Sequence, residues 1–177
     1  MSKFKRFVNE RTGMGQLKLV ENIGSYIAES HMHKKMSEGN KCKVRLYMIE
    51  GFNFAQRDLF SLSDPYLIIK CGSTVFDERK NYQLDTSDPK FFKCYEFMTT
   101  FPGSPLVEIE AWDYDDFFTD ELIGKSMLEL DDRYFSNEWQ SMSYKPVEYR
   151  DMFHSTSTIT QGVVKMWAEI HENDSEA

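Results

Sequence analysis

The chain has 177 residues, 41% of them hydrophobic, and a formal net charge of −8. This length suits one domain of ordinary size with some residues left over. The negative charge argues against nucleic acid as the main partner, and no apolar run reaches the roughly 18 residues that predict a transmembrane helix.

The charge is unevenly distributed, and the cysteines are scattered. The first 40 residues carry a net charge of +3 and the remainder −11. Cys42, Cys71 and Cys94 show no C-x-x-C spacing, which predicts buried free thiols in a reducing compartment rather than a zinc site. The N-terminus is basic but has no apolar core, so it does not predict a secretory signal. We therefore expect a cytoplasmic protein.

Residues 1–40 form a predicted N-terminal extension with two open interpretations. The apolar residues Leu17, Val20, Ile23 and Ile27 could form a helical stripe. Residues 16–20 could instead form an additional strand. We favour the helix, because the apolar spacing fits its period.

Residues 41–172 show the pattern of an all-β domain. In residues 42–50, Val44, Leu46 and Met48 alternate with polar residues, as in a half-buried strand. Similar runs occupy residues 65–71, 92–99, 106–112 and 163–170, with Gly, Pro and Ser turn signals between them. Such short strands predict a β-sandwich.

The rest of this region contains one expected helix and two irregular segments. A helix is expected at 130–140, where Asp131 and Asp132 suit the positive end of its dipole. Residues 154–161 have the composition of a linker, and residues 173–177 are expected to form a disordered tail.

An acidic cluster follows the strand predicted at 106–112. Five acids occupy the nine positions from 113 to 121: Asp113, Asp115, Asp116, Asp120 and Glu121. Such dense carboxylates repel one another unless water screens them or a cation binds, so the cluster is either a solvated loop or a metal site. Asp58 and Asp64 flank a second loop. Calcium prefers six to eight oxygen ligands, mostly carboxylates, and two acidic loops at one end of a sandwich can supply them.

An EF-hand does not explain the Asp113-x-Asp115 pattern. Its sixth loop position would be Phe118 instead of Gly, and its twelfth would be Gly124 instead of a bidentate Glu.

The motifs resemble a known family. Asp58-x5-Asp64-Pro65-Tyr66, followed by Trp112-Asp113-Tyr114-Asp115 and by Glu121-Leu122-Ile123-Gly124, resembles the calcium-binding C2 domains of synaptotagmins and protein kinase C. Further motifs resemble the ferlin version of this domain: Asp77-x-Arg79-x-Asn81-Tyr82, Asp88-Pro89-x-Phe91, Phe97-x3-Phe101-Pro102, residues 130–136 and Tyr149-Arg150-Asp151. Together they cover about residues 42–153.

The resemblance implies a fold and a set of ligands. The expected fold is an eight-stranded antiparallel β-sandwich of the C2 type, formed by residues 41–172. The family's five metal-ligand positions fall on Asp58, Asp64, Asp113, Asp115 and Glu121. Glu121 departs from the family's usual Asp, and Asp120 beside it offers another carboxylate. By analogy, the backbone carbonyls of Arg57 and Tyr114 complete the calcium shell.

Apolar residues interrupt both acidic loops. They could pack into the core, but their position at the loop tips favours contact with a membrane interface: Leu59, Phe60, Phe117 and Phe118. Burying each such side chain contributes roughly 1.5–3 kcal/mol. A separate group of basic residues is either a phosphoinositide site or, more commonly, a solvated face: Arg79, Lys80, Lys90 and Lys93.

These features predict calcium-dependent binding of anionic phospholipid membranes at the cytosolic face of a vesicle or the plasma membrane. Two calcium ions would nearly neutralise the five carboxylates, which otherwise repel anionic lipid. The ferlin resemblance implies a module of a larger chain that acts in vesicle fusion or membrane repair. The alternative is a calcium-independent protein-interaction or structural module. No catalytic constellation is visible, so we do not expect an enzyme.

Overall fold

The computed structural model describes residues 27, 33–57, 62–116 and 118–172. The chain divides into two units, Met1–Asn40 and Lys41–Ala177. In the first unit, residues 33–37 are helical. The stripe predicted at 17–27 lies, except for Ile27, outside the described residues.

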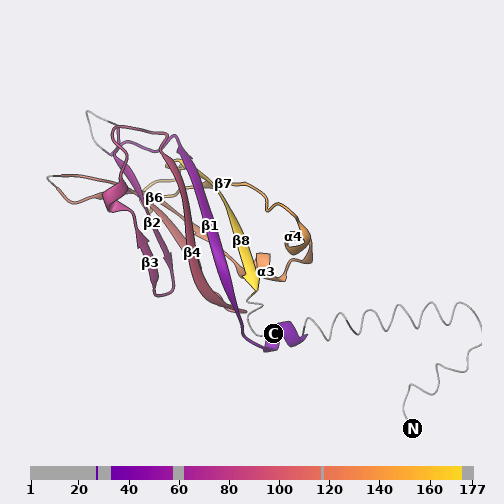
Figure 1. The fold of residues 1–177 in the computed structure, drawn as a ribbon. Helices are drawn as coiled ribbons and strands as arrows, with labels where there is room; N and C mark the ends of the chain where they lie inside the picture. The colour runs from indigo at the N-terminus through magenta and orange to yellow at the C-terminus, as the bar shows by residue number, and fades with distance from the viewer. Residues whose placement is uncertain (1–26, 28–32, 58–61, 117, 173–177) are drawn as a thin grey trace, which may run out of the picture. The chain divides into compact units, whose positions relative to one another are not determined.

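The second unit contains the strands, joined by short connections and helices (Figure 1). The elements of the described residues are β1 (Asn40–Phe52), β2 (Pro65–Cys71), β3 (Thr74–Asp77), η1 (Arg79–Asn81), β4 (Lys90–Phe101), β5 (Val107–Asp113), β6 (Glu121–Leu128), α3 (Asp131–Phe135), α4 (Asn137–Ser141), β7 (Glu148–Asp151) and β8 (Val163–Glu172).

The strands form two four-stranded sheets, with the orders β4-β1-β8-β7 and β3-β2-β5-β6. The pairs β1–β8, β7–β8, β2–β3, β2–β5 and β5–β6 are antiparallel. The predicted eight-stranded antiparallel sandwich is confirmed. In the described parts of the chain, no helix is long and apolar enough to cross a membrane.

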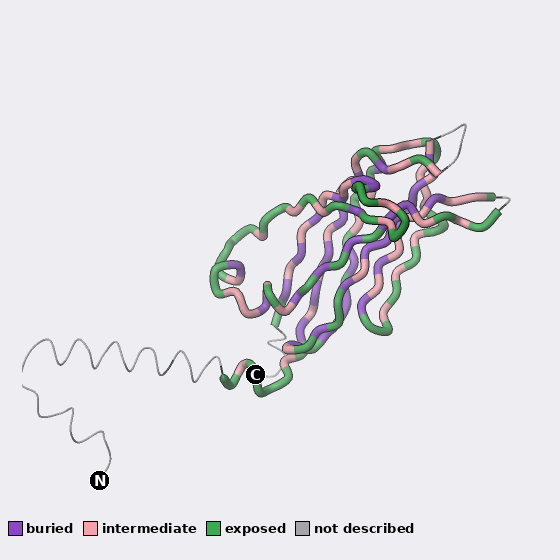
Figure 2. Tube along the Cα trace, turned by 180° about the vertical axis from the view of Figure 1, so that it is seen from behind, coloured by how far each residue is buried: buried purple, intermediate pink, exposed green. Residues whose placement is uncertain are grey.

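The core lies between the two sheets and follows the predicted alternation. Val44, Leu46 and Met48 of β1 are fully buried, and the residues between them are partly exposed. Figure 2 shows the same alternation of buried and more exposed positions along the strands. Leu67 and Ile109 supply core residues from the other sheet. Burial of apolar side chains between the sheets is therefore the main stabilising term of the fold.

The structure corrects two expectations. The helix expected at 130–140 is two short helices, α3 and α4, because Ser136 between them is extended and its hydroxyl caps α4 by accepting from Trp139 N at 3.1 Å. The cysteines are free as predicted, but Cys94 is exposed rather than buried. It alternates with the buried Tyr95 on β4 and therefore faces outward.

Three strands were not predicted. β3 and β7 have only four residues each and no buried position, so they lack a hydrophobic alternation. β6 begins with the acidic Glu121 and contains Gly124, which are both unfavourable in strands.

Connections that are far apart in the sequence meet at one end of the sandwich. Tyr114 N donates to Asp64 O at 3.0 Å, which joins the β5–β6 connection to the β1–β2 connection. Ala55 N donates to Gln161 O at 2.9 Å, which adds the β7–β8 connection. The two acidic loops predicted from the sequence therefore lie at the same end.

Gly162 provides a test of this arrangement. Its φ is +135°, and an added Cβ would lie 2.5 Å from Phe54 Cδ1 and 3.1 Å from Phe52 O. We expect Gly162→Ala to lower the free energy of unfolding by about 2 kcal/mol or more, because backbone strain and a clash add. Gly103→Ala is the matched control, since Gly103 has φ +85° but nothing within 4 Å of an added Cβ. Urea unfolding of both variants checks this. Equal losses would contradict the role of the close contact.

Candidate metal and membrane site

The register of β2 and β5 brings the two acidic loops together. Pro65 pairs with Asp113, so the last residue of β5 lies beside the first residue of β2. Asp64 N donates to Asp113 Oδ1 at 2.6 Å, and Asp113 is only 5% exposed. Asp64 Oδ1 in turn accepts from Asp85 N at 2.6 Å. Two predicted ligands are thus joined, because the Asp64 amide binds the Asp113 carboxylate and the Asp85 amide holds the Asp64 carboxylate.

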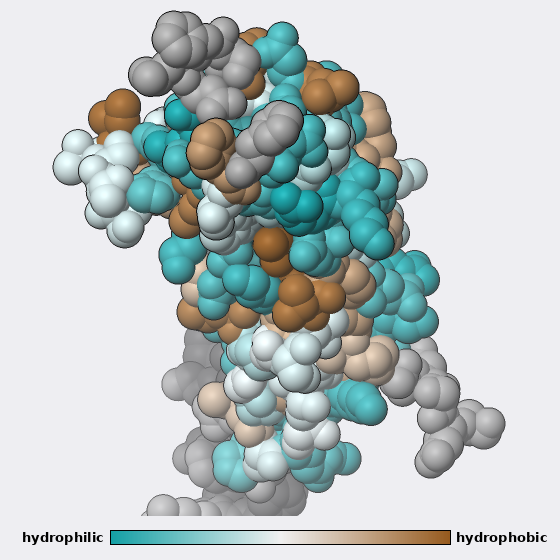
Figure 3. All heavy atoms as spheres, turned by 90° about the vertical axis from the view of Figure 1, so that its left-hand side faces the viewer, coloured by the Kyte–Doolittle hydropathy of each residue, from teal (hydrophilic) through white to brown (hydrophobic). Residues whose placement is uncertain are grey.

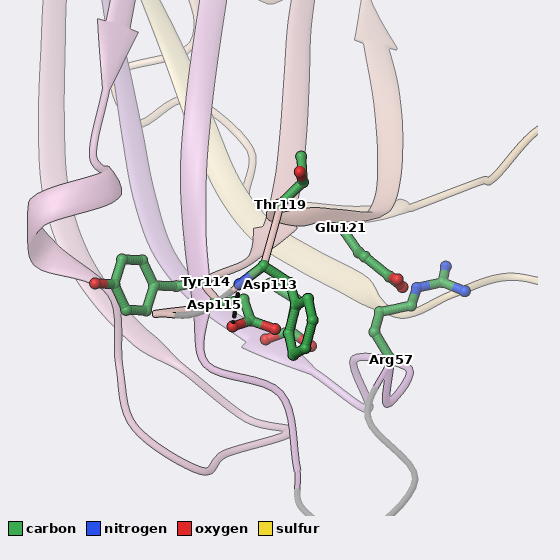
Figure 4. Close-up of a pocket in the computed structure, with 7 residues that line it drawn as sticks. Arg57, Asp113, Tyr114, Asp115, Thr119 and Glu121 are labelled. Carbon is green, nitrogen blue, oxygen red and sulfur yellow. Dashed lines mark hydrogen bonds between the residues drawn. The ribbon is translucent and has the colours of Figure 1, made fainter.

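A polar pocket of about 160 Å³ lies against Asp113, Asp115 and Glu121 (Figure 4). The remaining lining residues are Arg57, Tyr114, Phe118 and Thr119. Asp115 Oδ1 accepts from Phe118 N at 2.9 Å, which shapes the turn of the loop. The structure therefore brings three of the five predicted ligands to one pocket, with Asp64 bonded to one of them. Asp58 lies outside the described residues.

The donor chemistry of this pocket fits calcium. Its ionisable ligands are carboxylates, and calcium takes oxygen ligands in a flexible cage. Within the described residues, no group of three or more His, Cys, Asp or Glu side chains is close enough to hold a metal ion.

Asp120 does not offer a second carboxylate to this pocket, so that expectation is wrong. It lies in the β5–β6 connection, just before β6, and is not among the residues that line the pocket. Arg79 donates to both its oxygens, from Nε at 2.6 Å and from Nη2 at 2.9 Å. Tyr66 Oη donates to Oδ2 at 2.6 Å, and Asp115 N donates to Oδ1 at 3.2 Å. These bonds, chiefly that from Arg79, lower the pKa of Asp120 to about 2.

Arg79 also fixes the acidic loop from outside. Its guanidinium lies 4.4 Å from the centre of the Tyr114 ring, and Tyr114 stacks on Tyr82 with ring centres 4.0 Å apart. The loop that carries Asp115 is thus held to η1 by an ion pair and two ring contacts. Sequence reasoning identified this stretch as a family motif and Arg79 as one of four basic residues, and it missed the role of Arg79 in holding the acidic loop.

The basic residues considered for phosphoinositides are largely paired with acids. Arg79 binds Asp120, Lys93 Nζ lies 2.7 Å from Glu78 Oε2, and Lys90 pairs with Glu50. The solvated-face interpretation is therefore favoured over a free basic patch.

Exposed apolar residues occur in the connections at this end. Phe118 is 81% exposed, beside the pocket that it lines. Leu84, in the β3–β4 connection, and Ile159, in the β7–β8 connection, are also exposed and were missed because each is a single apolar residue in a polar turn. In Figure 3, hydrophobic side chains stand out among hydrophilic ones near this end. Leu59, Phe60 and Phe117 lie outside the described residues.

The Arg79–Asp120 pair gives a prediction about acid stability. Because the pKa of Asp120 is lowered from 3.8 to about 2, its contribution is present above about pH 4 and is lost as the pH falls through about 2. We expect Asp120→Asn to lower the free energy of unfolding at pH 7 by roughly 1–2 kcal/mol, discounted for the half-exposed Arg79, and to flatten its decline between pH 4 and 2. Chemical unfolding across this range measures the effect. Asp116→Asn controls for loop charge, and an equal effect of the two substitutions would refute the role of the pair.

Comparisons with known proteins show the family to which this fold belongs. A model of the C2 domain matches residues 42–145. The chain is 31% identical over 139 residues to ferlin 2 of Toxoplasma gondii, which covers 72% of this chain and 10% of that protein. It is 33% identical over 96 residues to human myoferlin, covering 54% of this chain and 5% of that protein. The chain thus spans about a tenth or less of these relatives.

Solved structures show the same fold. The two calcium-bound C2 domains of extended synaptotagmin 2 give a TM-score of 0.61 at 23% identity, over 74% of this chain and 46% of that one. Human GIVD cytosolic phospholipase A2 gives a TM-score of 0.58 at 17% identity, over 76% of this chain and 17% of that one. With the matched sandwich and the family model over more than half its length, the chain belongs to the C2 domain family and is similar to the ferlins.

Proposed function

We propose that this domain binds anionic phospholipid membranes in a calcium-dependent manner. The observation that carries the proposal is the shared pocket of Asp113, Asp115 and Glu121, which the exposed ring of Phe118 borders. Asp64, bonded to Asp113, and Asp58 are the proposed ligands from the β1–β2 connection.

The charges of the site supply a mechanism for this calcium dependence. Without a cation, the carboxylates repel phosphatidylserine headgroups. Bound calcium supplies positive charge at this end and can share lipid phosphate oxygens. The chain's own residues then bring Phe118 to the interface, where an aromatic ring is stabilised. Because Arg79 and Tyr82 already hold the loop, little rearrangement is needed.

The wider role follows from the relatives. Extended synaptotagmin 2 contains two calcium-bound C2 domains of the same fold, and the chain matches only a small part of the ferlins. We therefore propose a non-enzymatic module of a larger chain that acts at the cytosolic face of a membrane, in vesicle fusion or membrane repair.

The alternative is a calcium-independent interaction module. It is favoured by Glu121 in place of the family's Asp and by the open arrangement of acids in the described residues. Metal titration separates the two functions.

Calcium titration tests the metal site. We expect calcium at about 100 times its dissociation constant to stabilise the fold by about 2.7 kcal/mol and to raise the melting temperature by several degrees, with a much smaller effect of magnesium. Asp113→Asn combined with Asp115→Asn should abolish calcium binding and raise the stability of the metal-free protein, because repulsion is relieved. Asp116→Asn is the matched control in the same loop. No binding heat by calorimetry, or equal shifts with magnesium, would refute the site.

Membrane insertion is tested separately. We expect Phe118→Ala to weaken calcium-dependent binding to phosphatidylserine vesicles about tenfold, equivalent to about 1.4 kcal/mol, with nearly unchanged calcium affinity in solution. Tyr144→Ala is the matched control, since Tyr144 is 92% exposed and lies between α4 and β7. Vesicle sedimentation and thermal unfolding are measured on both variants. A destabilised Phe118→Ala variant with unchanged lipid affinity would show that this ring serves the fold.

A further inference from the structure

The pocket contains a positive side chain of the chain's own, Arg57. Sequence reasoning assigned a role only to its backbone carbonyl. We propose that the Arg57 guanidinium is a fixed counter-ion of the pocket, which balances Glu121 and limits the pocket to a single calcium ion at Asp113 and Asp115. The limit to one calcium ion rests on the proposed function. The balance of Glu121 by Arg57 does not, because it concerns the metal-free protein.

Arg57 is anchored at both its backbone and its side chain. Its amide donates to Ser63 Oγ at 3.3 Å, and Ser63 is 1% exposed. Its Nη2 donates to Gln161 Oε1 at 3.0 Å and to Ile123 O on β6. Gln161 is 7% exposed and donates to Ile159 O at 3.0 Å, so the acceptor is itself fixed. The guanidinium is therefore held by two elements far apart in sequence.

The charge of Arg57 is not neutralised by these bonds. A backbone carbonyl and a side-chain amide oxygen are neutral acceptors, so they position the guanidinium and leave its positive charge to act on the pocket. Its Nε is buried and has no hydrogen-bond partner among the described residues. Three carboxylates line that pocket together with Arg57. A fixed cation there attracts the carboxylates and opposes the entry of another cation.

Glu121 is the carboxylate best placed to be balanced in this way. In Figure 4, the side chains of Glu121 and Arg57 extend toward one another at one side of the pocket, while Asp113 and Asp115 lie together at the other. Glutamate is one methylene longer than the aspartate usual in the family, which extends the carboxylate away from β6. The pocket thus has an acidic end for a metal ion and an end that already holds a positive charge.

The proposed electrostatic balance between Arg57 and Glu121 is tested first in the metal-free protein by a cycle of Arg57→Gln, Glu121→Gln and the double variant. We expect Glu121→Gln to lower the melting temperature of the wild type but to raise that of the Arg57→Gln variant. If Arg57→Gln does not fold, the effect of Glu121→Gln on the melting temperature of the otherwise wild-type protein still tests the proposal. A higher melting temperature of Glu121→Gln in the wild type would mean that repulsion among the acids dominates, and it would overturn the pairing.

Calorimetry then tests the limit on calcium. We expect the wild-type chain to bind one calcium ion. Arg57→Gln should bind calcium about tenfold more tightly or bind a second ion. Arg57→Lys keeps the positive charge and should keep the wild-type stoichiometry. Arg57→Gln that matches the wild type in both affinity and stoichiometry would overturn the inference, even though the proposed calcium site stands. A wild type that binds no calcium would overturn the proposed function and the limit with it, whereas the metal-free cycle would still report on the pairing.

Discussion

The pairing of β2 with β5 is the constraint on which the functional end of this domain depends. Its register places Pro65 opposite Asp113, and the amide of Asp64 then donates to the Asp113 carboxylate. Two loops separated by about 50 residues are thereby fixed against each other by backbone geometry rather than by their own sequences. A shift of one residue would turn Asp113 away from its buried position, because strand side chains alternate between faces. The carboxylate pocket is thus a consequence of strand register.

Around this pocket, neighbouring acids have different roles because of their neighbours. Asp120, which lies just before β6, is held by Arg79 and Tyr66 and thereby stabilises the loop. Glu121, the next residue, faces the pocket with Arg57. Structural ion pairs thus surround a group of carboxylates that repel one another, and a bound cation would relieve that repulsion. This division suits a site that changes its charge while the loops keep their shape.

The sequence predicted the fold better than the details of the site. Alternation in β1 predicted strands of a sandwich. The C2 resemblance of the two acidic motifs implied the ligand positions, three of which, Asp113, Asp115 and Glu121, line one pocket. The roles of Asp120 and Arg57 could not be predicted, because their partners Arg79 and Gln161 lie 41 and 104 residues away in sequence. The split of the expected helix at Ser136 does have a local signal. Serine is a preferred N-cap residue, and the Ser136 hydroxyl caps α4 by accepting from Trp139 N.

The most direct test of the central claim is an amide NMR titration of the domain with calcium. The account predicts large shifts for the amides of Asp64, Tyr114, Asp115 and Phe118, and for those of residues 57–63. The amides of the β2–β3 turn, at Gly72 and Ser73, should remain unchanged. Shifts that are absent, or that are spread evenly over both ends of the sandwich, would contradict a calcium site built by the β2–β5 register.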